Sequence, residues 1–549
     1  MLKILKIKPA ELKIIFWIFL AIFFITTVPY AYGYLKTPHN YHYLGIHLAP
    51  ADIFVYESYI NQVKDGNFLI ENLYNNELPP EKNLNIFWLA TGYLAKIFNL
   101  SPFFALYAAK IILTPLLLLI IYFLISFFLI DTQKRKIAML LAVFSSGLGG
   151  LASPFLQKLS YTDNSIGYYH WPMDLWVSES NTFLTIYQSP HFIASLSFLL
   201  AVFLFFLLAF KHNKLSYSFI AGLLALIYFN FHPFYLINIF STAGIFLIII
   251  LIKDGKRKFL IGLKNLFIIF LISLPFIIYH AVKIIGDDIT REKATQNLCK
   301  TTSLPLTLIS FGLPLLIALY AIYYFIKTKK FSDENIFLTT WLFVNFILIY
   351  LPFIVFQRRL VEGAQIPIVI LAASGLFILW EKAKTKNNLL FRNKYLGYLF
   401  LAFIFSILIS SNLYVTVENF FLTREKAPYI KSDNVLAMKW LKNNIIEEET
   451  VIAHPVNGNI IPAIAARKVY AGHWVETTDY KNKVNNLLWL FKNNGDDRQK
   501  KEFLKNSRID YIFFSSMEDG LGDFNPEEKD YLRPVYKNGT VIVYKINLP

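Results

Sequence analysis

Charged residues and cysteines are scarce in this sequence. Charged side chains make up 16 % of the 549 residues, whereas a soluble globular protein carries about 25 %. Because 56 % of the residues are hydrophobic, the composition excludes a disordered chain and an ordinary soluble enzyme, and it predicts an integral membrane protein. The single cysteine, Cys299, excludes an internal disulfide and any metal site built from paired cysteines.

Several motifs with known chemistry are also absent. The sequence has no phosphate-binding loop, no Ser/His/Asp hydrolase arrangement and no haem-like motif. No repeat with a period of about 20–50 residues is visible, which argues against a solenoid. The net charge of +16 comes without an RNA- or DNA-binding motif, so we expect no nucleic acid partner.

Long apolar stretches are abundant instead. A transmembrane helix needs roughly 20 predominantly apolar residues, and eleven stretches are candidates. They are 13–32, 103–129, 137–150, 192–210, 216–231, 234–252, 259–279, 306–326, 336–356, 364–380 and 395–415. We interpret the first as a retained anchor, because it is too long for a signal peptide and no small-residue cleavage site follows it.

The distribution of Lys and Arg predicts the membrane orientation. With a cytoplasmic N-terminus, the inner segments hold 21 Lys and Arg, and the longer outer loops 35–102, 151–191, 280–305 and 357–363 hold 11. This bias follows the positive-inside rule. We therefore expect a multi-pass plasma-membrane protein whose membrane domain is 1–415. The abundance of Phe, Ile, Lys and Asn points to a prokaryote.

The C-terminal region, 416–549, is predicted to be an extracytoplasmic α/β domain. Helical patterns cover 434–444, 458–467, 479–493 and 496–506, and they alternate with strand patterns at 450–453, 468–471 and 508–516. Asn538-Gly539 lies between two further strand patterns and is a strong hairpin signal. Alternating strands and helices predict an open sheet that ends in a hairpin.

Asp52, near the start of the first outer loop, is the main catalytic candidate. Pro50 suits the first position of a helix, which places Asp52 in the first turn. Helical spacing puts Asp52 on the same face as Tyr56 and Tyr59, whereas Glu57 is expected to point toward water. A carboxylate on a largely apolar face is unusual, although Asp52 could instead only complement the helix dipole.

Four cations are candidates for binding an anionic group. Arg358 and Arg359 follow the ninth expected span, against the positive-inside bias, and guanidinium binds phosphate through paired donors. They could instead face lipid headgroups or the C-terminal domain. Lys110 could meet a lipid phosphate or snorkel to the interface. His191 could contact phosphate or metal, or hydrogen-bond as an ordinary interfacial histidine.

The second outer loop is rich in rings and contains three acids. His170 and Trp171 could stack on a sugar or belong to an aromatic belt at the membrane interface. Asp163, Asp174 and Glu179 could bind a hard cation, but they lack the spacing of a metal loop. We therefore expect no resident metal or other cofactor, and we leave a divalent metal open.

The layout of the chain resembles the GT-C superfamily of polytopic membrane glycosyltransferases. It is most similar to bacterial relatives of the dolichyl-phosphate-mannose protein mannosyltransferases. The shared features are a retained first span, a long first outer loop with an acid near its start, many spans and a C-terminal outer domain. Two stretches carry the resemblance, 50–66 and 356–375, the second with Arg358-Arg359, Ile366-Pro367 and Ala372-Ala373-Ser374-Gly375.

This resemblance implies transfer of a sugar from a polyprenyl-phosphate donor in the membrane to an acceptor outside it: an envelope glycan, a lipid or a protein. In the family an Asp of the first outer loop is the catalytic base, and Asp52 is the matching position. The second adjacent acid that the family often has is absent, because Ala51 and Ile53 flank Asp52. Direct displacement by the acceptor would invert the anomeric carbon.

The remaining candidates receive roles from the same resemblance. The donor phosphate would be bound by Arg358, Arg359, Lys110 and His191, and the acceptor or sugar by Tyr56, Tyr59, His170 and Trp171. A polyprenyl-linked glycan or lipid transporter, or flippase, is the alternative function, and a non-catalytic envelope scaffold is a third. For a transferase, we expect Asp52 and the two arginines to converge on one outward-facing cavity.

The charge bias predicts which sites are accessible from outside the cell. In a Cys299→Ser background, Asn538→Cys should react with an impermeant thiol reagent added to intact cells, and Lys256→Cys should react only after lysis. Labelling of Asn538→Cys only after lysis would mean that the number of spans is wrong by an odd number.

Overall fold

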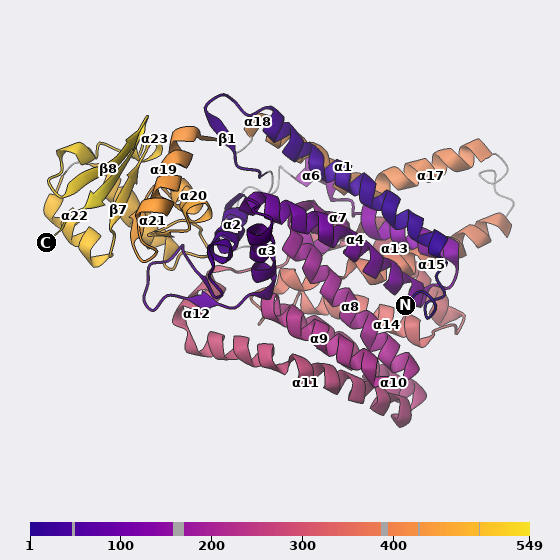
Figure 1. Cartoon of the computed structure of the whole chain (residues 1–549). Helices are drawn as coiled ribbons and strands as arrows, with labels where there is room; N and C mark the ends of the chain where they lie inside the picture. Colours follow the sequence, from indigo (N-terminus) through magenta and orange to yellow (C-terminus); the bar gives the residue numbers. More distant parts are fainter. Residues whose placement is uncertain (47–49, 157–169, 386–393, 427–428, 494, 549) are drawn as a thin grey trace. The chain divides into compact units, whose positions relative to one another are not determined.

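The computed structural model describes the chain except residues 47–49, 157–169, 386–393, 427–428, 494 and 549 (Figure 1). The chain forms two compact units, each described here by itself. The first unit comprises Met1–Thr27, Ala108–Val282 and Asn297–Phe420. The second comprises Val28–Tyr107, Lys283–Gln296 and Phe421–Pro549. The first outer loop and the segment 283–296 thus group with the C-terminal region. The predicted domain boundary near residue 415 stays a prediction.

Long apolar helices make up most of the first unit. In the described part of the chain, eight helical segments are long and apolar enough to cross a membrane, or nine if one bent pair is a single span. The main helices of these segments are α1 (Lys13–Leu35), α4 (Pro102–Phe128), α5 (Thr132–Phe144) with α6 (Gly149–Leu156), α8 (Pro190–His212), α10 (Leu236–Asp254), α11 (Lys256–Gly286), α13 (Leu304–Lys327) and α15 (Gln365–Thr385). The bent pair comes from α17 (Lys394–Leu408) and α18 (Ser410–Lys426), with an angle of 60°.

Each of the eleven predicted stretches coincides with a helix or a broken helix pair. Two of these helices, α9 (Leu215–Phe231) and α14 (Asp333–Leu348), have only 17 and 16 residues. The exact count of spans therefore stays a prediction. The predicted end of the ninth span at residue 356 is wrong, because α14 ends at Leu348. Pro352 follows shortly and disfavours a continued helix, since it has no N–H to donate.

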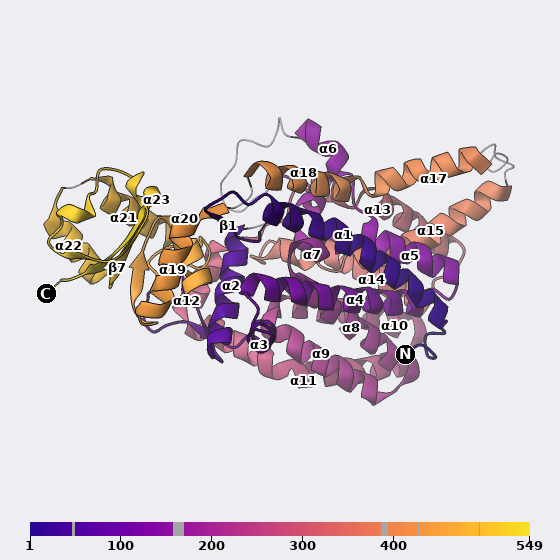
Figure 2. The ribbon, with the colours of Figure 1, turned by 45° about the horizontal axis from the view of Figure 1, so that its top comes forward.

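The helix α8 forms the centre of the first unit. Of its most apolar window, 83 % is buried, and it packs beside α9 in both views (Figures 1 and 2). The rings of Phe203, Phe206, Phe337 and Trp341 pack against one another between α8 and α14. Elsewhere α13 packs against α15, and α10 against α14.

A five-stranded sheet lies at the core of the C-terminal region. Its order is β6 (Lys468–Val469), β5 (Thr450–Ile452), β7 (Tyr511–Phe514), β9 (Val541–Ile546) and β8 (Leu532–Asn538). The first three strands are parallel, and the hairpin β8–β9 adds antiparallel strands beside β7. The predicted α/β domain with a terminal hairpin at Asn538-Gly539 is confirmed.

Helices cover both faces of this sheet. They are α19 (Ser432–Asn444), α20 (Pro455–Ala465), α21 (Tyr480–Lys492) and α22 (Asp497–Asn506), which start and end within three residues of the predicted bounds. Side chains alternate between the two faces of a strand, so Val451 joins an apolar cluster with α19 and α20, and Ile452 joins another with α21 and α22.

The first outer loop folds onto the C-terminal region. Its helix α2 (Pro50–Asp65) packs against α20 and against α3 (Ile86–Ile97), and its Phe54 and Val55 belong to the cluster of α19 and α20. The strand β1 (Tyr41–Tyr43) pairs antiparallel with β4 (Tyr429–Lys431). This packing places the first turn of α2, and with it Asp52, against the C-terminal region.

Candidate functional site

In the second unit, Asp52 is held by a histidine of the C-terminal region. Oδ1 of Asp52 lies 3.0 Å from Nε2 of His473, 421 positions further along the chain. The side chain of His473 is 4 % exposed, whereas that of Asp52 is 51 % exposed. The carboxylate of Asp52 is therefore accessible to water, and the imidazole that contacts it is buried. The sequence analysis missed His473, because no spacing relates the two residues.

The predicted exposure of the two acids of α2 is wrong. Asp52 is exposed, and Glu57, expected to point toward water, is only 8 % exposed. The exposure differs from the prediction because α20 packs against α2. The side chain of Asn61, on α2, donates a hydrogen bond to the carbonyl of Ala463 on α20. Burial raises the pKa of Glu57 to about 8, which leaves this side chain largely protonated at neutral pH.

The two predicted tyrosines of α2 lie together with a tryptophan of α3. The ring of Tyr56 stacks on that of Trp88, with centroids 4.7 Å apart, and the ring of Tyr59 lies 6.0 Å from it. Both tyrosines are half-buried. They belong to the same helix as Asp52, one and two turns further on, so an aromatic surface accompanies the carboxylate. Their role in binding sugar or acceptor stays a prediction.

In the first unit, His191 belongs to a buried polar cluster. Its ring centroid lies 5.5 Å from that of His232, and the two rings are nearly perpendicular. Nδ1 of His232 lies 2.7 Å from Oγ of Ser195, which in turn lies 3.1 Å from the hydroxyl of Tyr228. Oγ of Ser189 lies 2.9 Å from Nδ1 of His191.

The two predicted arginines lie in the 3₁₀ helix η5 (Gln357–Val361), which precedes α15. The guanidinium of Arg358 lies 4.3 Å from the ring of Trp176. The guanidinium of Arg359 lies 5.3 Å from the ring of Phe234 and is electrostatically coupled to both His191 and His232. Arg359 also forms a hydrogen bond with the side chain of Cys299, and it interacts electrostatically with the carboxylates of Glu179 and Glu362.

A buried carboxylate close to these groups was not predicted. Glu362, three residues beyond Arg359, is 2 % exposed, and neither of its oxygens has a hydrogen-bond partner among the described residues. The side chains of Tyr235, Ser195 and Arg359 are close enough to interact with this carboxylate. An acid shortly after two arginines is ordinarily interpreted as an exposed ion-pair partner, so no sequence pattern indicated that Glu362 is buried.

The other cationic candidate, Lys110 on α4, is buried among protein atoms. It is 6 % exposed, and its Nζ donates to the carbonyl of Tyr187 over 3.2 Å. A role in binding the donor phosphate stays a prediction.

The candidate residues of the second outer loop differ in how deeply they are buried. His170 and Trp171 are half-buried, and the carbonyl of Trp171 accepts from the indole of Trp176. Asp174 is fully buried, and its Oδ2 accepts from the backbone N–H of Gly149 over 3.2 Å. Burial raises the pKa of Asp174 to about 7. Asp163 lies outside the described residues.

The candidate residues therefore form one group in each unit. Asp52, Tyr56 and Tyr59 belong to the second unit, and the arginines with His191 to the first. Their convergence on one cavity stays a prediction. Among the described residues, no group of three or more His, Cys, Asp and Glu side chains is placed to hold a metal ion.

Comparison with known proteins identifies the fold. No protein-family model and no curated protein sequence matches the chain. One similar solved structure is the oligosaccharyltransferase of Archaeoglobus fulgidus tethered with an acceptor peptide containing the NVT sequon. The alignment covers 92 % of this chain and 69 % of that one, with 13 % sequence identity and a TM-score of 0.55. The archaeal oligosaccharyltransferase AglB from the same organism, in complex with an inhibitory peptide and a dolichol-phosphate, aligns over the same shares, with 12 % identity and a TM-score of 0.53.

A weaker likeness links the chain to ArnT from Cupriavidus metallidurans bound to undecaprenyl phosphate. It has 10 % identity and a TM-score of 0.48, over 96 % of this chain and 97 % of the other. The oligosaccharyltransferases are GT-C glycosyltransferases. The chain has the GT-C fold and is a multi-pass membrane protein, as its sequence led us to expect.

Proposed function

We propose that this chain is a membrane glycosyltransferase that transfers a sugar from a polyprenyl-phosphate donor to an acceptor on the extracytoplasmic side of a plasma membrane. The observation that carries the proposal is Asp52. It lies in the first turn of α2 on a GT-C fold, and its half-exposed carboxylate is hydrogen-bonded to a buried histidine. The resemblance seen in the sequence implies the role of catalytic base for this residue.

The chemistry assigned to Asp52 is general base catalysis. The acceptor hydroxyl attacks the anomeric carbon, its proton passes to the carboxylate of Asp52, and the bond from that carbon to the phosphate oxygen breaks. The phosphate leaves with the bonding electron pair, and attack from the opposite side inverts the anomeric carbon. A base must lie within hydrogen-bond reach of the attacking hydroxyl, which an exposed carboxylate allows.

The leaving phosphate needs positive charge placed in advance, and we assign this task to Arg359. Its guanidinium lies in a buried polar cluster with His191 and His232, and the carboxylates of Glu179 and Glu362 keep it charged there. Arg358 instead covers the ring of Trp176. The planar guanidinium can engage two phosphate oxygens at once.

The direct test is an assay of the purified protein against a panel of polyprenyl-phosphate sugars. Formation of a glycosylated acceptor together with free polyprenyl phosphate supports the proposal. Translocation of intact donor without such a product would support the transporter alternative and contradict the proposal. Parallel reactions with and without a chelator decide whether a divalent metal is required.

Asp52→Asn should lower transfer by about 100-fold or more, the loss expected for removing a positioned general base, and donor binding should persist. Asp65→Asn is the matched control at the other end of α2. Asp65 pairs with Lys442 at the surface, where such pairs contribute little. Equal transfer by Asp52→Asn and the parent protein would remove Asp52 from the mechanism.

Arg359→Lys should weaken donor binding by about 10-fold or more although the charge is kept, because a hydrogen bond to a charged group contributes about 1.5–3 kcal/mol. Arg358→Lys, the matched control on the adjacent residue, should have a mild effect. Titration with a fluorescent polyprenyl phosphate measures both. If both variants bind like the parent, the arginines are structural or contact headgroups.

A further inference from the structure

The hydrogen bonds around His473 determine where its proton lies. Nδ1 of this ring accepts from the backbone N–H groups of Val475 and Glu476, over 3.2 and 3.3 Å. A ring nitrogen that accepts carries no hydrogen, so the proton of the neutral imidazole is on Nε2. Nε2 therefore donates to Oδ1 of Asp52 over 3.0 Å.

This arrangement leaves the two residues with different tasks. Both ring nitrogens of His473 are engaged, so the imidazole has no lone pair available to take a proton from an acceptor. Oδ1 of Asp52 is also engaged, which leaves Oδ2 as the oxygen that can receive the acceptor's proton. The histidine thus fixes the orientation of the carboxylate.

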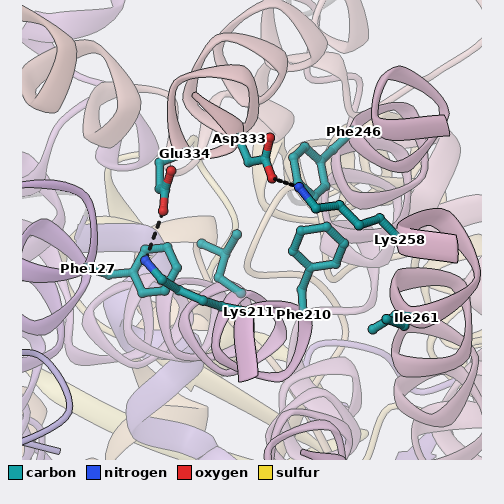
Figure 3. A pocket seen from close by; sticks show the side chains of 9 residues that line it. Phe127, Phe210, Lys211, Phe246, Lys258, Ile261, Asp333 and Glu334 are labelled. Atoms are coloured by element: carbon teal, nitrogen blue, oxygen red, sulfur yellow. Dashed lines mark hydrogen bonds and ion pairs between the residues drawn. The ribbon is translucent and has the colours of Figure 1, made fainter. Parts of the chain in front are cut away.

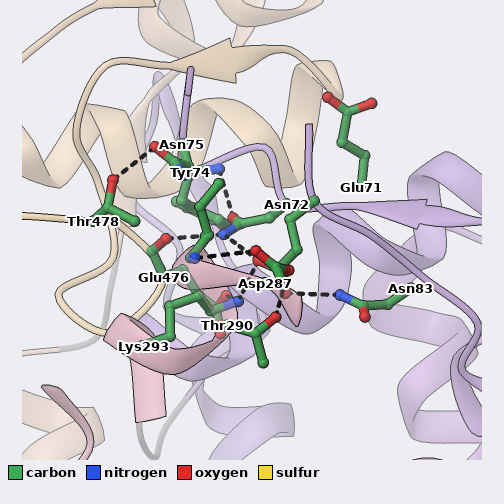
Figure 4. A network of polar contacts seen from close by, with 12 residues as sticks. Glu71, Asn72, Tyr74, Asn75, Asn83, Asp287, Thr290, Lys293, Glu476 and Thr478 are labelled. Carbon is green, nitrogen blue, oxygen red and sulfur yellow. Dashed lines mark hydrogen bonds and ion pairs between the residues drawn. The ribbon is translucent and has the colours of Figure 1, made fainter. Parts of the chain in front are cut away.

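The loop that carries His473 is anchored on the first outer loop and on α12 (Asp288–Gln296). Oγ1 of Thr477 accepts from the N–H of Gly472 and donates to the carbonyl of Tyr74. Nζ of Lys293, on α12, lies 2.5 Å from Glu476 and 2.9 Å from Glu81. Figure 4 shows Glu476 and Lys293 within this network, close to Asn72 and Tyr74.

We propose that His473 is a positioning residue for Asp52, so that the C-terminal region completes the catalytic centre of the enzyme. This inference rests on the proposed function. It gives the C-terminal region a role in the chemical step itself, because the residue that orients the base belongs to a loop of that region.

The test compares His473→Ala, which removes the donor, with His473→Gln, whose amide can still donate to Asp52. His473→Ala should lower kcat by about 10- to 100-fold, the scale of a misplaced reacting group, and leave the donor KM nearly unchanged. His473→Gln should restore most of the rate.

Two further measurements separate failure of this inference from failure of the proposed function. A double-mutant cycle on thermal unfolding with Asp52→Ala and His473→Ala, each of which removes one partner of the hydrogen bond, should show coupling, whatever the enzyme transfers. In an Asp52→Asn background, His473→Ala should cost little further activity. A parental kcat in His473→Ala, or additive effects in both cycles, would overturn the inference. Absence of transfer by the parent protein would overturn only the proposed function.

The first unit also contains a cavity of about 240 Å³ (Figure 3). Its walls are apolar, and its charged lining consists of two lysines and two acids. The lining residues are Phe127, Leu207, Phe210, Lys211, Phe246, Lys258, Ile261, Asp333 and Glu334. Lys211 pairs with Glu334 over 2.9 Å, and Lys258 with Asp333 over 2.8 Å.

The position of the cavity follows from the helix α8. His191 lies near its first residue and Lys211 near its last, and 20 residues of helix rise about 30 Å, the thickness of the hydrocarbon core. The cavity therefore lies at the membrane boundary opposite to His191. In the orientation predicted from the sequence, this is the cytoplasmic boundary.

We infer that this cavity binds a phospholipid whose zwitterionic headgroup carries a primary ammonium. Its phosphate would accept from Lys211 and Lys258, its ammonium would donate to Asp333 and Glu334, and an acyl chain would lie on the phenylalanine walls. The equal numbers of lysines and acids give no net attraction for a purely anionic lipid. These ion pairs are partly exposed, and such pairs contribute little, so exchanging them for a headgroup costs little.

Native mass spectrometry after reconstitution in equimolar phosphatidylethanolamine, phosphatidylcholine and phosphatidylglycerol tests the site. Phosphatidylethanolamine should be retained at least about 10-fold over the other two, and Asp333→Asn/Glu334→Gln should abolish the preference. Asp254→Asn is the control, because Asp254 also pairs with Lys258 but does not line the cavity. No retained lipid, or equal retention of all three, would overturn this inference without affecting the proposed function.

Discussion

The packing of α2 against α20 is the contact on which the candidate catalytic centre depends. Phe54 and Val55 of the first outer loop lie in one apolar cluster with Ile460 and Ile461 of the C-terminal region. Fully burying an apolar side chain of this size contributes about 1.5–3 kcal/mol, so several such residues hold the two segments together. Because this packing sets the first turn of α2 beside residue 473, a short hydrogen bond to Asp52 can form.

A buried lysine with two acidic partners links three segments of the second unit. Lys293 lies between Glu81 and Glu476, and each acid comes from a different segment of the chain. Burial alone would lower the pKa of Lys293, but the two carboxylates raise it above its ordinary value, so the lysine stays charged. A buried charge left without its partner is strongly destabilising, so these ion pairs favour the arrangement in which the segment 283–296, the first outer loop and the C-terminal region meet.

In the first unit, several buried ionisable side chains lie close to Arg359. Glu362 has no hydrogen-bond partner among the described residues, and His191 and His232 lie edge to face in the same cluster. Ionisable groups within an apolar helix bundle are costly and ordinarily serve a function. Binding of a charged lipid carrier, as proposed for Arg359, would be such a function.

The sequence by itself determined the helices and the C-terminal fold, because these depend on local patterns. Apolar length gave all eleven helical stretches, and Asn538-Gly539 fixed the hairpin through the backbone angles that its turn requires. Tertiary structure decided the exposure of Asp52 and Glu57, because α20 covers one face of α2 and no periodicity within α2 encodes that partner. It also decided that His473 meets Asp52, since only folding relates residues that are 421 positions apart.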